Sequence, residues 1–299
     1  MINRTNINVV NWDQTKFGPT ILDQGCGARR GFAMRSILRT AFALAAVVSV
    51  AACAGTPSDP IAREAYIEAN DPIEPFNRGV YSFNKALDNG FIKPVAKTYR
   101  DNLPKTFRDS IRNFLNNLRT PIILANNILQ GDQTAAQVTL SRFVTNTIAG
   151  FGGFGDPAGD LGATFRDEDF GQTLAVWGFG EGPYIMLPVL GPSNPRDAIG
   201  LLVDSFIDPF NTWADNTDHV EATVSRFAVH GVDLRSRHIK SLDDMEKSSL
   251  DFYTTIRSLY RQLRTDAITN GDAGDSIPSP SISFDDGDKL LDQSAQLKN

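Results

Sequence analysis

Cysteine is almost absent from this chain of 299 residues, which contains only Cys26 and Cys53. Both lie near the N-terminal end, so a body folded from the residues after Cys53 has no thiol of its own. A disulfide framework and a cysteine-based metal site are therefore excluded. The three histidines have neither the spacing of an HExxH motif nor cysteine partners, and we predict no metal site.

Motifs for catalysis and cofactor binding are also missing. No Gly-x-Ser-x-Gly elbow is present, so an esterase or lipase would need an unrecognised nucleophile. The series Gly178-x-Gly180-x-Gly182 lacks the spacing of a dinucleotide loop, and no βαβ pattern surrounds it. The triplet Asp167-Glu168-Asp169 lacks the alternating oxygen ligands of a calcium loop, and we interpret it as a solvated acidic loop. We predict neither enzymatic activity nor a cofactor.

Acidic side chains outnumber basic ones outside the N-terminal region. The whole chain carries a net charge of −6, but residues 1–52 carry +4, which leaves −10 for residues 53–299. The large negative charge of this body disfavours nucleic acid as a partner. Electrostatic attraction alone would not hold it to anionic lipid either, so membrane contact must come mainly from acyl chains and apolar faces.

The stretch from Met34 to Cys53 has the layout of a secretory signal peptide. Two arginines precede an almost purely apolar run over 41–50, which is too short for a membrane span of ~20 apolar residues. The final Val-Ala-Ala-Cys resembles the lipobox of bacterial lipoproteins, which predicts acylation of Cys53; the alternative is an ordinary signal peptide with a chance cysteine. We expect translation to start at Met34, with residues 1–33 a mis-called N-terminal extension.

The remaining chain divides by composition into a tether (53–70), a folded domain (71–264) and an acidic tail (265–299) that we expect to be disordered. Apolar residues at helical spacing predict an all-α domain of four or five amphipathic helices. The first contains Phe76, Val80, Phe83 and Leu87 on one face and ends at Asn89-Gly90.

Further helices are expected over about 133–149, around 199–206 and over about 241–264. The first of these three should begin after Asp132 as N-cap and bury one apolar stripe: Ala136, Leu140, Phe143, Val144 and Ile148. Pro121 is expected to start a separate short apolar piece.

The glycine-rich middle over 170–192 is expected to be non-helical. Its apolar runs at 174–177 and 184–187 would be short buried strands or loops that dip into lipid. Residues 191–195 are expected to form a turn.

Residues 91–119 form a basic island within this acidic body. A basic amphipathic helix is a candidate for lying in a lipid interface, whereas the alternative is a solvated charged face on an ordinary packed helix. The cations of the island are Lys93, Lys97, Arg100, Lys105, Arg108, Arg112 and Arg119.

Ordered motifs give the domain a resemblance to the MlaA/VacJ family of outer-membrane lipoproteins. They begin with Asp71-Pro72-Ile73-Glu74-Pro75-Phe76-Asn77-Arg78 and Tyr81-Ser82-Phe83-Asn84, and continue in family order to Leu187-Pro188. Among those between are Leu129-Gln130-Gly131-Asp132, Gly152-Gly153-Phe154 and Trp177-Gly178-x-Gly180-x-Gly182-Pro183-Tyr184.

The resemblance implies a ring-like helical body embedded in the inner (periplasmic) leaflet of the outer membrane, with a central amphipathic channel. It implies that mislocalised phospholipid is removed from the outer leaflet and passed to the periplasmic phospholipid carrier of the Mla system. Trimeric porins are implied as neighbours. Glycine-rich backbone is tolerated in a membrane only where it is buried or lines a wet cavity, so segments 150–162 and 178–183 are expected to line the channel or act as hinges.

Two groups of candidate residues follow from these motifs and from the basic island. Those expected to line the channel or contact lipid are Phe76, Asn77, Arg78, Phe83, Asn84, Gly152, Gly153, Gly180 and Tyr184. Those expected to contact headgroups or a partner protein are Lys93, Lys97, Arg100, Arg108 and Arg112. We expect deletion of the Phe83–Asn84 pair to alter channel gating more than stability; the alternative is a core phenylalanine beside a surface asparagine.

Two other functions remain open at this point. One is a structural or adhesive surface lipoprotein that scaffolds porins or contacts host cells, which would purify without lipid. The other is a phospholipase, which the missing nucleophile elbow argues against.

Overall fold

The computed structural model describes residues 69–271, which belong to one compact unit of the chain. The predicted signal peptide, Cys53, and most of the predicted tether and acidic tail lie outside the described residues. The predicted all-α class is confirmed, because the described part is helical apart from one short hairpin. In chain order its elements are α3 (Glu74–Leu87), a π-helical turn η2 (Asp88–Ile92), α4 (Lys93–Asn102), α5 (Lys105–Gln130), α6 (Gln133–Ile148), α7 (Pro157–Asp160), α8 (Phe170–Val176), β1 (Ile185–Leu187), β2 (Gly191–Ser193), α9 (Pro195–Ile207), α10 (Pro209–Asn216), α11 (Val220–Arg237), α12 (Ile239–Ser248) and α13 (Phe252–Ile268).

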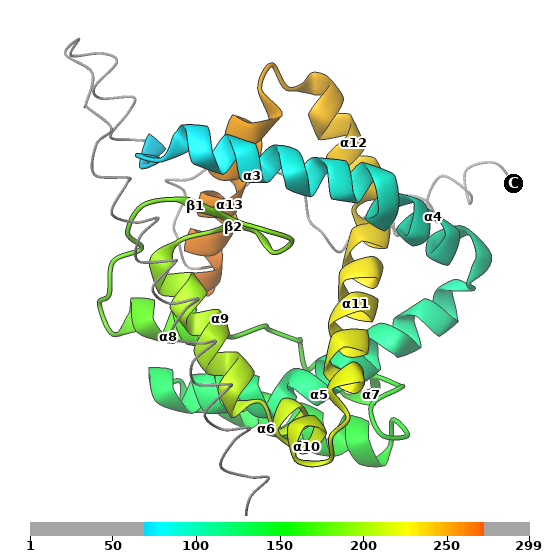
Figure 1. Cartoon of the computed structure of the whole chain (residues 1–299). Coiled ribbons are helices and arrows are strands. Elements are labelled where there is room, and N and C mark those ends of the chain that lie inside the picture. The colour runs from blue at the N-terminus through cyan, green and yellow to red at the C-terminus, as the bar shows by residue number, and fades with distance from the viewer. Residues whose placement is uncertain (1–68, 272–299) are drawn as a thin grey trace, which may run out of the picture. The chain divides into compact units, whose positions relative to one another are not determined.

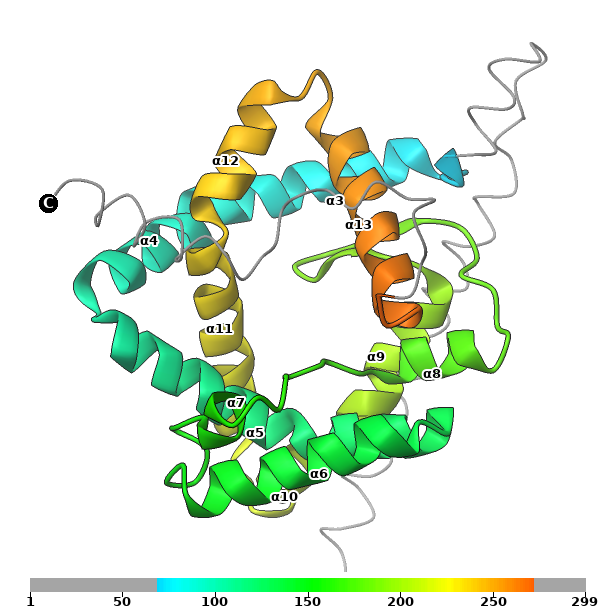
Figure 2. The same ribbon diagram turned by 180° about the vertical axis from the view of Figure 1, so that it is seen from behind.

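The helices of this unit follow one another around a ring (Figure 1). Helices α3, α4, α5, α6 and α9 form its sides, and the helix pairs in most extensive contact are α5 with α6, α8 with α9, and α4 with α11. Seen from behind, the segment over 161–169 runs across from α7 to α8 (Figure 2). None of the helices within residues 69–271 is long and apolar enough to cross a membrane.

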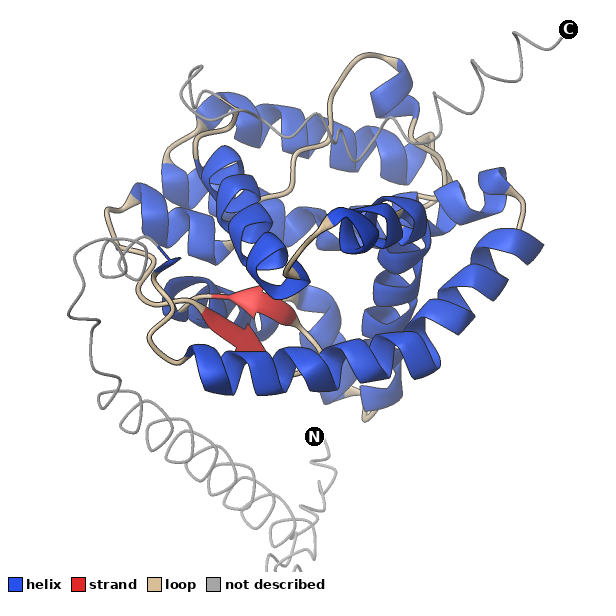
Figure 3. Ribbon diagram, turned by 90° about the horizontal axis from the view of Figure 1, so that it is seen from above, coloured by secondary structure: helices blue, strands red, loops and turns tan. Residues whose placement is uncertain are grey.

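The hairpin lies against α3, as the view from above shows (Figure 3). Strands β1 and β2 are antiparallel, and Met186 pairs with Pro192. Beside them a small apolar core contains Tyr184, Met186 and Tyr253, with Val80 and Tyr81 of α3 packed against it. The ring of Tyr253 meets those of Tyr81 and Tyr184 edge-on, at centroid distances of 5.6 and 6.2 Å.

Several helix ends lie where the sequence predicts them. Gly131 ends α5 in the left-handed conformation at φ 80°, which a glycine adopts without a steric cost. Asp132 then caps α6, because its carboxylate accepts a hydrogen bond of 2.8 Å from the backbone N–H of Ala135. Asp208 follows α9 directly and caps α10.

Two expected helix breaks are wrong. Asn89-Gly90 does not end the first helix, because a π-helical turn carries the chain on into α4. The carboxylate of Asp88 in this turn accepts two hydrogen bonds of 2.8 Å from Arg235, which fix the turn to α11. Pro121 lies inside α5 and starts no new element. An internal proline costs ~3 kcal/mol or more, and we attribute its tolerance to the packing of α5 along α6.

The glycine-rich middle contains more regular structure than expected. Residues 174–176 belong to helix α8, and residues 191–193, expected as part of a turn, form strand β2. Strand β1 agrees with the expectation of a short buried strand near 184–187. Helix α11 was not expected, and the predicted helix over 241–264 is two helices. Asp251 separates them by capping α13 through the N–H of Tyr253 at 3.1 Å.

The expected direction of burial is also wrong. On α6 the buried residues are Thr139, Arg142 and Asn146, whereas Leu140 and Ile148 are exposed. Helix α9 repeats the pattern, with three buried residues (Arg196, Gly200 and Asp204) opposite three exposed ones (Ile199, Leu202 and Phe206). Among residues 69–271, twenty buried side chains are polar or charged and ten are apolar. Helices α6 and α9 thus turn their polar faces into the protein, whereas α5 buries three large apolar residues (Leu115, Ile122 and Ile123) beside three asparagines.

Candidate functional site

Ion pairs and amides connect the polar faces of the helices. Arg142 of α6 donates to both carboxylate oxygens of Asp156, at 2.9 and 3.0 Å, and Asn146 donates to the same carboxylate at 2.8 Å. Asp156 also caps α7 by accepting from the N–H of Gly159 at 3.0 Å. This cluster fixes the glycine-rich turn after α6 against the buried face of that helix.

A second cluster joins α8, α9 and α13 around Arg264. Its guanidinium donates to both oxygens of Asp169, at 2.6 and 2.7 Å, and to Asp197 at 3.0 Å. Burial by itself would raise the pKa of Asp169, but the hydrogen bonds and charge of Arg264 outweigh it and lower the pKa to about 2. The hydroxyl of Tyr260 donates to Asp197, and burial followed by this hydrogen bond raises the pKa of Tyr260.

A third cluster surrounds Asp71, the first residue of the family motif. Asp71 accepts from Asn77 at 2.7 Å, from Arg257 at 2.9 Å and from the hydroxyl of Tyr253. Asn77 also donates to the backbone carbonyl of Tyr184 at 3.1 Å. The cluster attaches the start of the domain to the hairpin and to α13.

The candidate residues of α3 therefore lie in two different environments. Phe76 and Phe83 are 51% and 55% exposed, while Asn77 is fully buried. Asn84 donates to the carbonyl of Leu187 at 2.9 Å, and its amide oxygen accepts from the N–H of Val189 at 2.7 Å, so it holds the end of the hairpin.

Arg78 and Tyr184 also make structural contacts. Arg78 binds Glu74 and Asp251 and lies over the ring of Tyr253 at 4.4 Å. Tyr184 is in the apolar core, where burial raises the pKa of its hydroxyl. Contact of these residues with lipid stays a prediction.

The three candidate glycines also differ from one another. Gly152 and Gly153 have φ of 74° and 97°, which favours glycine. A Cβ on Gly153 would lie 2.4 Å from the Cβ of Asn117, so this turn needs glycine to approach α5. A Cβ on Gly180 would meet nothing within 4 Å, so packing does not require glycine at this position.

Most cations of the basic island have partners within the domain. Lys93 binds Asp243 of α12 at 2.7 Å, Arg100 binds Asp101 at 2.9 Å, and Arg112 binds Asp109. Arg108 donates to the carbonyl of Leu103 at 3.3 Å, and Lys97 is exposed. These pairings favour a charged face on a packed helix for much of the island, and contact with headgroups or a partner stays a prediction.

The acidic triplet is not the solvated loop that the sequence indicated. Glu168 is 1% exposed and accepts from Gln130 at 3.0 Å, and burial raises its pKa. Asp169 belongs to the Arg264 cluster. Asp167 lies 3.0 Å from the Nε atom of Arg119. Glu168 and Asp169 thus contribute to the polar interior, whereas Asp167 is exposed.

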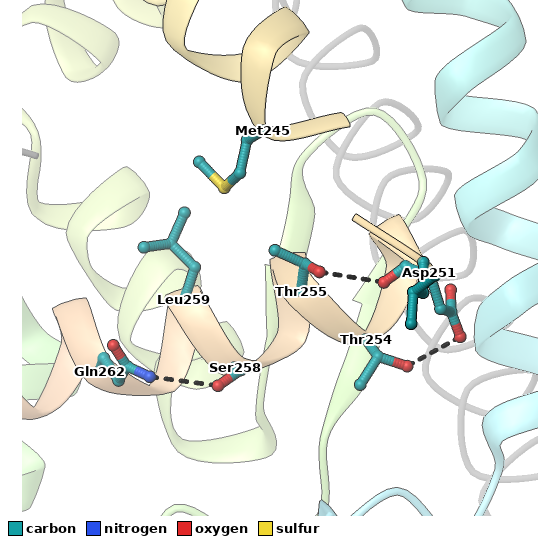
Figure 4. Close-up of a pocket in the computed structure, with 8 residues that line it drawn as sticks. Met245, Asp251, Thr254, Thr255, Ser258, Leu259 and Gln262 are labelled. Carbon is teal, nitrogen blue, oxygen red and sulfur yellow. Dashed lines mark hydrogen bonds between the residues drawn. The ribbon is translucent and has the colours of Figure 1, made fainter. Parts of the chain in front are cut away.

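One groove of about 570 Å³ lies between α12 and α13 (Figure 4). Hydrogen bonds from Thr254 to the Asp251 carboxylate (2.8 Å) and from Gln262 to Ser258 (3.2 Å) occupy much of its polar lining. None of the candidate residues named from the sequence lines this groove.

The fold and the motif residues agree with one protein family. The family model described as "MlaA lipoprotein" matches residues 69–267, which is nearly all of the described structure. The chain belongs to the MlaA lipoprotein family. Its domain as predicted from the sequence, 71–264, lies within the matched range.

Relatives from several bacteria share this domain. The chain is 36% identical over 208 residues to "Intermembrane phospholipid transport system lipoprotein MlaA" of Escherichia coli (strain K12), covering 68% of this chain and 79% of the relative. The protein of the same name in Haemophilus influenzae is 30% identical over 229 residues, covering 75% and 89%. An uncharacterised protein of Rickettsia bellii is 33% identical over 198 residues, covering 66% and 76%.

A solved structure has the same fold. It is described as "Structural basis for maintenance of bacterial outer membrane lipid asymmetry", and it matches with a TM-score of 0.60 at 32% sequence identity. The match covers 66% of this chain and 98% of the solved one. Nearly the whole of that protein therefore has a counterpart in this chain.

The long-range ion pairs are the part of the site that sequence reasoning missed. Arg264 and Asp169 are 95 positions apart, and Arg142 carries no local signal of its partner Asp156. The sequence did offer one signal, which is that Arg142 lies on the face of α6 opposite the apolar residues. A buried arginine requires an acidic partner, so a carboxylate could have been sought for it.

Proposed function

We propose that this lipoprotein forms a route along which phospholipid leaves the outer leaflet of the outer membrane, so that the lipid asymmetry of that membrane is maintained. The names of the relatives and of the solved structure support this role. The observation that carries it is the direction of burial in helices α6 and α9, whose polar faces point inward and whose apolar residues are exposed.

The exposed apolar side chains are suited to a lipid environment. Burying a large apolar side chain stabilises by roughly 1.5–3 kcal/mol relative to leaving it in water. Four phenylalanines are more than half exposed: Phe83, Phe91, Phe206 and Phe227. In water each of them would lose much of this stabilisation. In acyl chains the same surfaces are matched to their solvent, and a contiguous exposed apolar surface is typical of a membrane-contacting protein.

The polar interior supplies the other requirement. A diacyl phospholipid carries a headgroup that needs polar surroundings and tails that need apolar ones. The Arg142, Arg264 and Asp71 clusters line helix faces that point inward, so a headgroup could pass along the interior of the ring while the tails follow apolar surface. No energy source is encoded in the motifs, and a passive route shifts no equilibrium.

We therefore place the net direction of transport with partner proteins. In this proposal the body sits in the periplasmic leaflet, acylated at Cys53, beside a trimeric porin. It delivers phospholipid to a periplasmic carrier of the Mla system, and it acts without catalysing a reaction.

Deletion of the gene tests this function. We expect surface-exposed phospholipid to rise and resistance to detergent to fall, and we expect the full-length protein supplied from a plasmid to restore both. Surface labelling of phospholipid in intact cells gives the direct measurement. Unchanged outer-leaflet phospholipid in the deletion strain would contradict the proposal.

A further inference from the structure

An ion pair of unusual openness lies where α5, α11 and the segment 161–169 come together. Arg119 comes from α5 and Asp167 from that segment, and the Nε atom of Arg119 is 3.0 Å from an oxygen of Asp167. His230 of α11 lies near enough for the charges of both residues to act on it. Three separate parts of the chain thus contribute to one polar spot.

This spot is accessible and enclosed at the same time. The side chains of Arg119 and Asp167 keep 32% and 51% of their surface accessible. Burial nevertheless raises the pKa of Asp167 and lowers that of His230, so protein surrounds both groups densely.

The arginine retains hydrogen-bonding capacity. Its Nε–H is not directed at the nearby Asp167 oxygen, and that buried nitrogen has no acceptor among residues 69–271. The Nε–H of Arg112, two helical turns earlier on the same face of α5, is buried and unpaired in the same way. Buried donors of this kind cost free energy unless an acceptor completes them.

The surrounding charges restrict which acceptor fits. Besides Asp167, the carboxylates of Asp169, Asp204 and Asp208 all act on Arg119. Asp169 is held by Arg264, Asp204 by Asn126, and Asp208 by Arg226 at 2.6 Å. Because two of these carboxylates are paired with other arginines and Asp204 is held by an amide, Asp167 is the one best able to bind an added cation, which favours a zwitterion over a simple anion. Asp167 is the one of the four whose side chain is half accessible.

We infer that Arg119 and Asp167 form a headgroup site for a zwitterionic phospholipid, with Arg119 donating to the phosphate and Asp167 accepting from the ammonium. Guanidinium matches the geometry of phosphate oxygens, and a carboxylate is the natural partner of an ammonium group. The inference rests on the proposed function and adds a headgroup preference to it. An ethanolamine phospholipid fits the pair, and a glycerol phospholipid, which lacks the ammonium, fits it less well.

Lipid retention by the purified full-length lipoprotein tests the site. The protein in detergent is incubated with equimolar phosphatidylethanolamine and phosphatidylglycerol, re-purified, and its bound lipid is measured by mass spectrometry. We expect the unaltered protein to retain more phosphatidylethanolamine. Asp167→Asn should lower the ratio of the two lipids about tenfold, and Arg119→Gln should lower total retained lipid about tenfold, as loss of a charged hydrogen bond predicts.

Arg261→Gln is the matched control, because it removes an arginine of similar accessibility whose partner is Glu181 at 2.9 Å and which is not among the residues expected to contact lipid. It should leave both the amount and the ratio of bound lipids unchanged. If Arg119→Gln does not accumulate, Asp167→Asn, which keeps the shape of the side chain, carries the test alone.

The outcomes separate this inference from the function beneath it. An unaltered protein that binds both lipids, together with an Asp167→Asn variant of the same ratio, overturns the headgroup site and leaves the transport function standing. An unaltered protein that retains no phospholipid overturns both.

Discussion

The side chain of Asn77 donates a hydrogen bond of 3.1 Å to the backbone carbonyl of Tyr184, 107 positions further along the chain. The amide oxygen of Asn77 accepts from the N–H of Met186 at 2.9 Å, so one side chain replaces a strand partner for β1. The motif that begins at Asp71 thus has a structural task, which is to hold the hairpin against α3.

Replacing this asparagine should destabilise the domain. Asn77→Ala removes one of the donors to Asp71 and leaves the carbonyl of Tyr184 and the N–H of Met186 without this buried partner, and we expect a loss of about 2–4 kcal/mol in the free energy of unfolding. Thermal or urea unfolding in detergent measures it. Asn89→Ala, at an exposed position of η2, is the control and should change stability by less than about 0.5 kcal/mol. Equal stability of the two variants would contradict the structural role.

Asp169 should make stability depend on pH. Its pKa is about 2 in the folded state, below the ordinary value of about 4, so the folded protein holds this carboxylate ionised. The stabilisation is fully present above pH 4 and is lost as the pH falls from about 4 to about 2. A pKa lowered from about 4 to about 2 corresponds to roughly 2–3 kcal/mol in the free energy of unfolding.

Unfolding of the protein and of Asp169→Asn, followed between pH 6 and pH 2, checks this prediction. The variant should be less stable at pH 6, and the two curves should converge near pH 2. Glu168 and Asp204 have pKa values raised by burial and contribute the opposite slope, but both proteins contain them, so they cancel in the difference. A constant difference from pH 6 to pH 2 would show that Asp169 does not titrate as described.

The exposed apolar face of α9 should matter for membranes and little for folding. Replacing Leu202 and Phe206 by serine removes two side chains that are more than half exposed. We expect the free energy of unfolding in detergent to change by less than about 1 kcal/mol, and binding of the non-acylated protein to phospholipid vesicles to weaken at least tenfold. Ile123→Ser, at a buried position of α5, should do the reverse: lower stability without a direct effect on vesicle binding.

Asn84 connects α3 to the end of the hairpin, and its loss should alter lipid passage more than stability. Asn84→Ala removes the bonds to Leu187 and Val189, which we expect to cost about 1–2 kcal/mol while the hairpin gains freedom beside the interior. Outer-leaflet phospholipid and detergent resistance in cells measure the effect on transport. Ser82→Ala, which loses only a bond within its own helix, is the control. An Asn84→Ala strain with normal lipid distribution would argue that the hairpin contacts are structural alone.

Local signals in the sequence predicted much of the fold. Asp132 and Gly131 mark helix ends through side-chain capping and a left-handed backbone, which depend on a few neighbouring residues. The helix break predicted at Pro121 was wrong, because the packing of α5 on α6 that stabilises the helix there depends on residues beyond its immediate neighbours in the sequence. Asp251 carried a cap signal that the continuous apolar pattern concealed.

The side of each helix that faces the protein could not be read from periodicity. Amphipathic spacing gives two faces, and only the solvent decides which one is outside; Leu140 and Thr139 exchange their expected roles on α6 for this reason. The interior pairs, such as Arg119 with Asp167, join segments that only the closed fold brings together.

The π-helical turn after α3 has one more consequence. An α-helix turns by about 100° per residue, so Phe91, eight positions after Phe83, would point well away from it on an uninterrupted α-helix. One additional residue in the turn cancels that rotation, and Phe76, Phe83 and Phe91 keep a common azimuth along α3 and η2. Deleting one residue from Asp88–Ile92 would therefore join α3 to α4 as an ordinary α-helix of unchanged phase. An α-helical path through all five residues would instead rotate α4 by about 100° and turn its lysines toward the side that the phenylalanines occupy.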